Sequence, residues 1–85
     1  MIVSGPVTLA NAGPLLEEGR RHLADGVQSV DLAEVSEMDS ALLGLLLAWV
    51  REARLHERSL QFTNLPESLR TIARLYGVDR LLPAS

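Results

Sequence analysis

The sequence predicts an α/β domain with a small mixed, mostly parallel β-sheet and with its helices packed mainly on one face. Short apolar stretches rich in Val, Leu and Ile alternate with longer stretches whose apolar residues recur at helical spacing. Strands that alternate with helices are joined by right-handed crossovers, which make neighbouring strands parallel. The chain has only 85 residues and no internal repeat, so we expect one domain over residues 1–85.

The first segment combines two apolar pieces with a helix. Residues 1–3 and 7–9 are apolar and stand on either side of Gly5-Pro6, so we expect a small hairpin or two edge strands there. A helix over Leu15–Ala24 follows and is ended by Asp25-Gly26. The residues expected on its core face are Leu15, Leu16, Gly19, His22 and Leu23.

The middle of the chain continues the alternation. We expect a strand over Val27–Leu32, a loop over Ala33–Met38 and a helix from Ser40 to about His56. A turn at Glu57-Arg58 leads to a further strand over Leu60–Thr63.

The last segment predicts a third helix. Asn64-Leu65-Pro66-Glu67 is a strong start, because Asn can cap, Pro fits a first turn and Glu can reach back to the cap. Gly77 is a suitable stop, and Val78–Leu82 is expected to add one short helical turn. The apolar residues at helical spacing are Leu65, Leu69, Ile72, Ala73 and Tyr76.

Composition and spacing argue against an enzyme, a metal site and a nucleic-acid partner. The net charge is −3 and Cys is absent, so neither a thiolate metal site nor a basic nucleic-acid stripe is expected. His22 and His56 lack the spacing of a zinc pair, and the glycines form no phosphate loop. We therefore expect no catalytic residues, no metal and no cofactor.

The hydropathy pattern predicts a cytoplasmic protein that does not insert into a membrane. No basic segment precedes an apolar one at Met1, as a secretory signal would require. The longest apolar run, Ala41–Val50, is about half of the roughly 20 residues that span a bilayer.

The helix that begins at Ser40 is more apolar than a surface helix requires. At 100° per residue its apolar residues cover an arc of about 200°, whereas a surface helix needs about 100°. Either neighbouring elements bury the excess or one margin meets a partner. We expect the Leu43/Leu47 margin to be exposed beside Arg51 and Arg54, because Arg is enriched at interfaces. Simple solvation of these two side chains is the alternative.

An Asp-Ser pair stands at the start of this helix. Asp39 can cap the helix, which would leave Ser40 as an ordinary first-turn residue. Alternatively, the Ser40 hydroxyl serves recognition or regulation, because a helix N-terminus favours phosphate and acceptor groups.

Several segments together resemble the STAS domain, the fold of sulfate transporters and anti-sigma-factor antagonists. The segments that carry this resemblance are residues 4–8, 30–35, 38–47, 62–69, 73–78 and 81–83. It implies a SpoIIAA-like fold, for which the part before Gly5 looks short, so the first strand is expected to be truncated or missing. The C-terminal segments are most similar to the MlaB branch, the cytoplasmic STAS subunit of an ABC system that maintains outer-membrane lipid asymmetry.

The resemblance implies a non-enzymatic accessory subunit. It would bind and support the ATPase of an ABC phospholipid transporter, in a complex with permease and substrate-binding subunits, and it would lie at the inner membrane only through that partner. The alternative is an anti-sigma-factor antagonist regulated by phosphorylation of Ser40. In the family the key Ser or Thr follows an Asp at the start of the second helix, and Ser40 and Asp39 match these positions.

One departure from the family pattern bears on that alternative. The family motif usually continues with Gly, whereas Ala41-Leu42 follow here, which favours a standing contact over a phosphorylation switch. We expect the Asn64–Glu67 loop to flank the same surface, since both helices would begin at one end of a parallel sheet. The expected partner-binding residues are Ser36, Met38, Asp39, Ser40, Leu43, Leu47, Arg51, Arg54 and Asn64.

Overall fold

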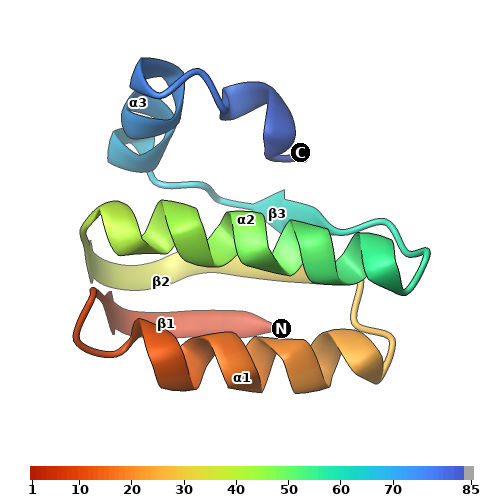
Figure 1. The fold of residues 1–85 in the computed structure, drawn as a ribbon. Coiled ribbons are helices and arrows are strands. Elements are labelled where there is room, and N and C mark those ends of the chain that lie inside the picture. The colour runs from red at the N-terminus through yellow and green to blue at the C-terminus, as the bar shows by residue number, and fades with distance from the viewer. Residues whose placement is uncertain (84–85) are drawn as a thin grey trace.

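A three-stranded parallel sheet with the strand order β1-β2-β3 organises the computed structural model, which describes residues 1–83 (Figure 1). The elements are β1 (Ile2–Val7), α1 (Ala12–Ala24), β2 (Ser29–Met38), α2 (Ser40–Leu55), β3 (Gln61–Thr63), α3 (Glu67–Leu75) and the 3-10 helix η1 (Asp79–Leu81). The predicted α/β class is confirmed, and every pairing among the described strands is parallel. The last two residues of the predicted domain lie outside the described range.

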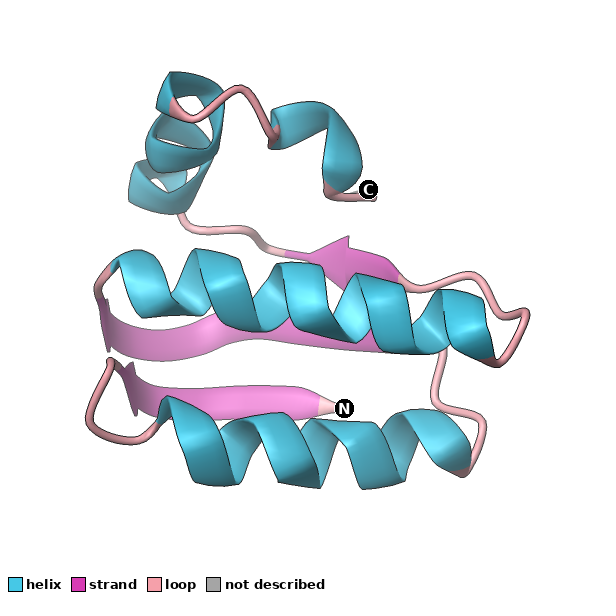
Figure 2. Cartoon of the chain, in the orientation of Figure 1, coloured by secondary structure: helices cyan, strands magenta, loops and turns pink. Residues whose placement is uncertain are grey.

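Helices α1 and α2 lie side by side on the same face of the sheet (Figure 2). The reason is topological: both crossovers step in the same direction across the sheet, so right-handed connections place both helices on one face. The helix α3 and η1 lie at the β3 side (Figure 1). Between the sheet and the helices lies an aliphatic core with one Trp and one Phe, whose fully buried large side chains are Trp49, Phe62, Leu23, Leu32, Leu42, Leu46, Leu69, Val7 and Val30.

The opposite face of the sheet is polar and uncovered. Side chains alternate along a strand, so the neighbours of the buried Val3, Val7 and Val30 point away from the helices. The register shift in β2 sets Glu34 opposite Ser4 and Glu37 opposite Pro6. The exposed residues of this face are Ile2, Ser4, Pro6, Ser29, Glu34, Glu37 and Gln61. The expectation that the helices cover mainly one face is therefore met.

The N-terminal segment forms one continuous strand, so the predicted hairpin or pair of edge strands is wrong. Gly5 and Pro6 lie inside β1. Gly5 has a φ of 79° and the register with β2 shifts on either side of it. Because β1 is an edge strand, a residue without an N–H is tolerated within it.

The strand β2 is longer than predicted. Residues 33–38 were expected to form a loop, but they pair with β1 from Ser4 opposite Glu34 to Val7 opposite Met38. Strand β3 pairs only with residues 29–31, so this second half of β2 has a single neighbour. Residues 33–38 are mostly polar or small because this half of the strand has β1 as its only neighbouring strand among the described residues. Hydropathy patterning therefore did not indicate a strand there.

The predicted helices form, with corrected ends. Helix α1 begins at Ala12, before Pro14, and His22 is exposed rather than core-facing. Helix α2 begins at Ser40 as predicted.

Helix α3 begins at Glu67, and Asn64 does not cap it. Gly77, with a φ of 70°, follows the end of α3 as expected. Tyr76 is 66% exposed and does not belong to the core.

Candidate binding surface on the second helix

The start of α2 is fixed by Asp39, as the sequence predicted. The Oδ1 atom of Asp39 accepts a hydrogen bond from the Ala41 N–H at 2.8 Å, which satisfies one unpaired donor of the first turn. The Oδ2 atom accepts a second bond from the Leu9 N–H at 3.1 Å. Both carboxylate oxygens are therefore used within the chain, and they tie the loop after β1 to the start of α2.

Ser40 is the first residue of α2, and its side chain is exposed. Because Asp39 provides the cap, the Ser40 hydroxyl is not needed for it. Within residues 1–83 this hydroxyl makes no hydrogen bond. It is therefore available to a partner at the positive end of the helix dipole.

An outward strip of α2 continues from Ser40 along the helix. At 100° per residue, Ser40, Leu47, Arg51 and Arg54 fall within about 60° of one another on the helix surface. Ser40, Arg51 and Arg54 are exposed and Leu47 is half-buried. We call these four residues the Ser40 strip. It is the part of the predicted surface that the structure brings together.

Leu43 does not belong to the exposed margin. It is 4% exposed and lies in the core, so its assignment to an exposed edge is wrong. Helix α3 packs against α2 from the β3 side of the molecule. Of the predicted Leu43/Leu47 margin, only Leu47 is partly exposed. It lines a hollow of about 190 Å³ together with Val50, Arg51, Arg54 and Leu81.

Part of the wide apolar surface of α2 is exposed on the side that faces α1. A shallow groove of about 290 Å³ runs between α1 and α2, and its lining is almost wholly apolar. The residues that line it are Leu9, Ala12, Gly13, Leu16, Ala41, Gly44, Leu45 and Ala48. Sequence analysis missed this groove, although the spacing of the small residues Ala41, Gly44 and Ala48 on one helix face was a signal for it.

Ser36 and Met38, at the end of β2, have different surroundings. Ser36 is exposed, and Met38 is half-buried. The Met38 Sδ atom accepts a hydrogen bond from the Ser68 hydroxyl at 3.6 Å, which joins the end of β2 to the first turn of α3. The first turn of α3 therefore lies beside the end of β2 that leads into α2, whereas Asn64, the first residue of the loop expected to flank this surface, does not.

Asn64 lies elsewhere. It has a φ of 57°, and its Nδ2 atom donates to the Oδ1 atom of Asp31 at 2.9 Å. The same Oδ1 atom accepts the Ala33 N–H at 2.9 Å. These hydrogen bonds hold the pKa of Asp31 below its ordinary value of 3.8, and the bond from Asn64 has the larger effect. Asp31 and Met38 are seven residues apart on β2, or roughly 23 Å, so Asn64 is remote from Ser40.

Within residues 1–83, no group of three or more His, Cys, Asp or Glu side chains is arranged to hold a metal ion. None of the helices in this range combines the length and the hydropathy needed to cross a membrane.

The chain was also compared with known families and structures. A family model described as "Mlab, STAS domain" matches residues 1–83. The anti-sigma factor antagonist SpoIIAA in its unphosphorylated form is similar in structure, with a TM-score of 0.72 at 16% identity, over 99% of this chain and 76% of that one.

Two other solved structures are also similar to this chain. A putative anti-sigma factor antagonist from Thermotoga maritima has a TM-score of 0.77 at 17% identity, over 98% of this chain and 75% of that one. The phosphorylated form of the Bacillus protein SpoIIAA has a TM-score of 0.68 at 17% identity, over 99% and 78%. These likenesses establish a shared fold.

Proposed function

Because the chain belongs to the MlaB-type STAS domain family, we propose that it is a non-catalytic accessory subunit that binds the ATPase of an ABC phospholipid transporter. In that role it supports a transporter that maintains outer-membrane lipid asymmetry, together with permease and substrate-binding subunits. It lies on the cytoplasmic side of the inner membrane and reaches the membrane only through the ATPase.

The observation that carries this proposal is the exposed Ser40 on a rigidly capped helix. Asp39 uses both carboxylate oxygens within the chain, so the position of Ser40 is fixed before a partner arrives. The strip then adds one apolar side chain and two guanidinium groups without a partner in residues 1–83. A hydroxyl, an apolar contact and exposed Arg on one helix face suit a protein surface.

Calorimetric titration of the ATPase subunit with purified chain tests the proposal. We expect Ser40→Arg and Ser40→Glu to weaken binding about tenfold or more, because each places a long charged group inside the proposed contact. Ser4→Arg is the matched control, because Ser4 is an exposed Ser on the open face of the sheet. Circular dichroism establishes that each variant is folded. Equal affinity of the folded Ser40 variants and the unmodified chain would contradict the proposed surface.

The alternative function, an anti-sigma-factor antagonist, makes a different prediction for the same residue. It requires that a cognate serine kinase labels Ser40 and that the label abolishes partner binding. A phosphate there would gain from the helix N-terminus and be repelled by the neighbouring Asp39 carboxylate. Mass spectrometry of the chain purified from its native cells separates the two functions, because a standing ATPase contact needs no label.

A further inference from the structure

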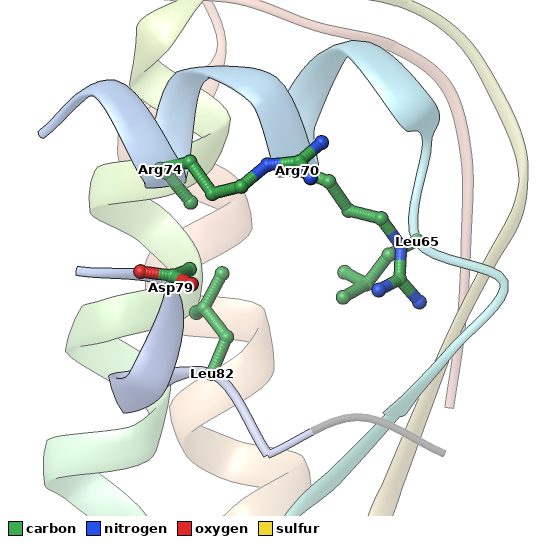
Figure 3. A pocket seen from close by; sticks show the side chains of 6 residues that line it. Leu65, Arg70, Arg74, Asp79 and Leu82 are labelled. Atoms are coloured by element: carbon green, nitrogen blue, oxygen red, sulfur yellow. The ribbon is translucent and has the colours of Figure 1, made fainter. Parts of the chain in front are cut away.

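A small pocket lies between α3 and η1, away from the Ser40 strip. It has a volume of about 180 Å³, and its apolar lining comes from Leu65, Ala73 and Leu82. Figure 3 shows the Arg74 side chain extended along α3 with Asp79 of η1 across from it, and the Arg70 side chain reaching toward Leu65. Cofactor sites usually exceed about 300 Å³, so this pocket has room for one or two side chains of a peptide.

The two Arg side chains of the pocket have no partner within the described chain. The ion pairs in residues 1–83 involve only Arg20, and Arg58 donates to backbone carbonyls. Arg70 and Arg74 stand four residues apart on α3, an arrangement in which like charges repel. An anion between the two guanidinium groups would remove that repulsion and accept several charge-assisted hydrogen bonds.

The charge distribution favours an acidic occupant at this end of the molecule. Residues 64–83 carry three Arg and two acidic residues, whereas residues 1–63 carry five Arg and nine acidic residues. The C-terminal part is therefore locally positive on a negative chain. The pocket adjoins a second basic surface, the hollow beside Arg51 and Arg54. Leu81 lines that hollow, and the next residue, Leu82, lines the pocket.

Asp79 and the apolar lining decide which kind of acidic ligand fits. A free inorganic anion would meet the Asp79 carboxylate as well as the guanidinium groups, and it would leave Leu65 and Leu82 uncovered. A peptide offers backbone N–H donors to Asp79, a carboxylate to the two Arg, and an apolar side chain to the lining.

We propose that the pocket between α3 and η1 binds an extended peptide segment of a partner protein, in which an acidic residue is flanked by apolar ones. Arg70 and Arg74 hold the carboxylate, Leu65 and Leu82 contact the apolar neighbour, and Asp79 accepts a peptide N–H. This site extends the protein-binding role proposed above to a second surface, and it does not involve Ser40.

NMR titration of the full ¹⁵N-labelled chain with a synthetic peptide tests the site. The probe is acetyl-Gly-Leu-Glu-Leu-Gly-amide, and its partner probe carries Gln in place of Glu. We expect the Glu peptide to shift the amide signals of residues 65–82 and to bind about tenfold or more tightly than the Gln peptide. Absence of shifts, or equal binding of both peptides, overturns the proposal.

Variants separate the site from general charge attraction. The double variant Arg70→Gln/Arg74→Gln is expected to lose at least tenfold in peptide affinity, whereas Arg20→Gln/Arg21→Gln, which removes the same charge from α1, keeps it. Inorganic phosphate is the second probe, and equal shifts of the same amides by phosphate would show general anion binding and overturn the peptide site.

The two proposals fail independently. The Ser40→Arg chain is expected to bind the Glu peptide as the unmodified chain does, because Ser40 does not line the pocket. If the Arg double variant does not fold, the comparison of the Glu and Gln peptides on the unmodified chain still decides the outcome.

Discussion

Helices α1 and α3 both pack beside α2, but they are held there in different ways. On the α1 side, Gly19 is buried against Trp49 so closely that an added Cβ atom would overlap the indole ring. The Trp49 Nε1 atom donates to the Leu16 carbonyl at 3.3 Å, and the Arg20 Nε atom lies 3.5 Å from a Glu52 carboxylate oxygen.

On the α3 side the attachment is mainly apolar. Leu69 and Ala73 are fully buried, and within residues 1–83 no side-chain hydrogen bond or ion pair joins α3 to α2. The Ser68 hydroxyl instead bonds to Met38 of β2, and the Thr71 hydroxyl bonds to a carbonyl within α3. Arg70 and Arg74 face the solvent. The contacts on the α1 side therefore stabilise the fold, whereas the α3 side leaves charged groups exposed for a partner.

The largest effect is expected from Gly19→Ala, which breaks the α1 side. The added methyl group would overlap Trp49 and force α1 and α2 apart, at a cost of about 1–3 kcal/mol in the free energy of unfolding. Urea denaturation measures it. Gly44→Ala is the matched control, because no atom lies within 4 Å of its added Cβ and Ala favours helix by roughly 0.5–1 kcal/mol. Equal midpoints for Gly19→Ala and the unmodified chain would show that close contact is not required.

A smaller effect is expected from Asp39→Ala, which loosens the tie between the loop after β1 and α2. The variant loses the cap on Ala41 and the acceptor for the Leu9 N–H, at a cost of about 1 kcal/mol. Asp39→Asn keeps a capping oxygen and should lose less, since Asn caps about as well as Asp. Thermal unfolding followed by circular dichroism gives both values, and the reverse ranking would argue against a capping role.

The smallest effect is expected at Asp31, which holds the loop that leads into α3. Its pKa is lowered in the folded state, so its contribution to stability is present above the unfolded value of 3.8 and is lost as pH falls through the folded pKa. Asn64→Ala removes the largest cause of the shift, so the pKa of Asp31 should move up toward 3.8. Carboxyl NMR titration measures the midpoint, and an unmoved midpoint would contradict the assigned cause.

Much of the fold could be predicted from the sequence because its signals are local. The core stripe of α2, with Leu42, Leu46, Trp49 and Ala53 all buried, follows from helical periodicity. The second half of β2 could not be predicted in this way, because its strand form depends on pairing with β1, more than 25 residues earlier. Asn64 shows the same limit: its capping propensity is local, but its bond to Asp31 is not.

The α/β class with a mostly parallel sheet, the position of α2 and the cap by Asp39 thus follow from the sequence, since they depend on spacing, chirality and one adjacent side chain. Only the tertiary structure decided that Leu43 is covered, that the α1 margin of α2 is open, and that Arg70 and Arg74 share a pocket with Asp79. Exposure and pocket formation depend on which distant element packs against a helix face. The residues of that face do not by themselves indicate which element this is.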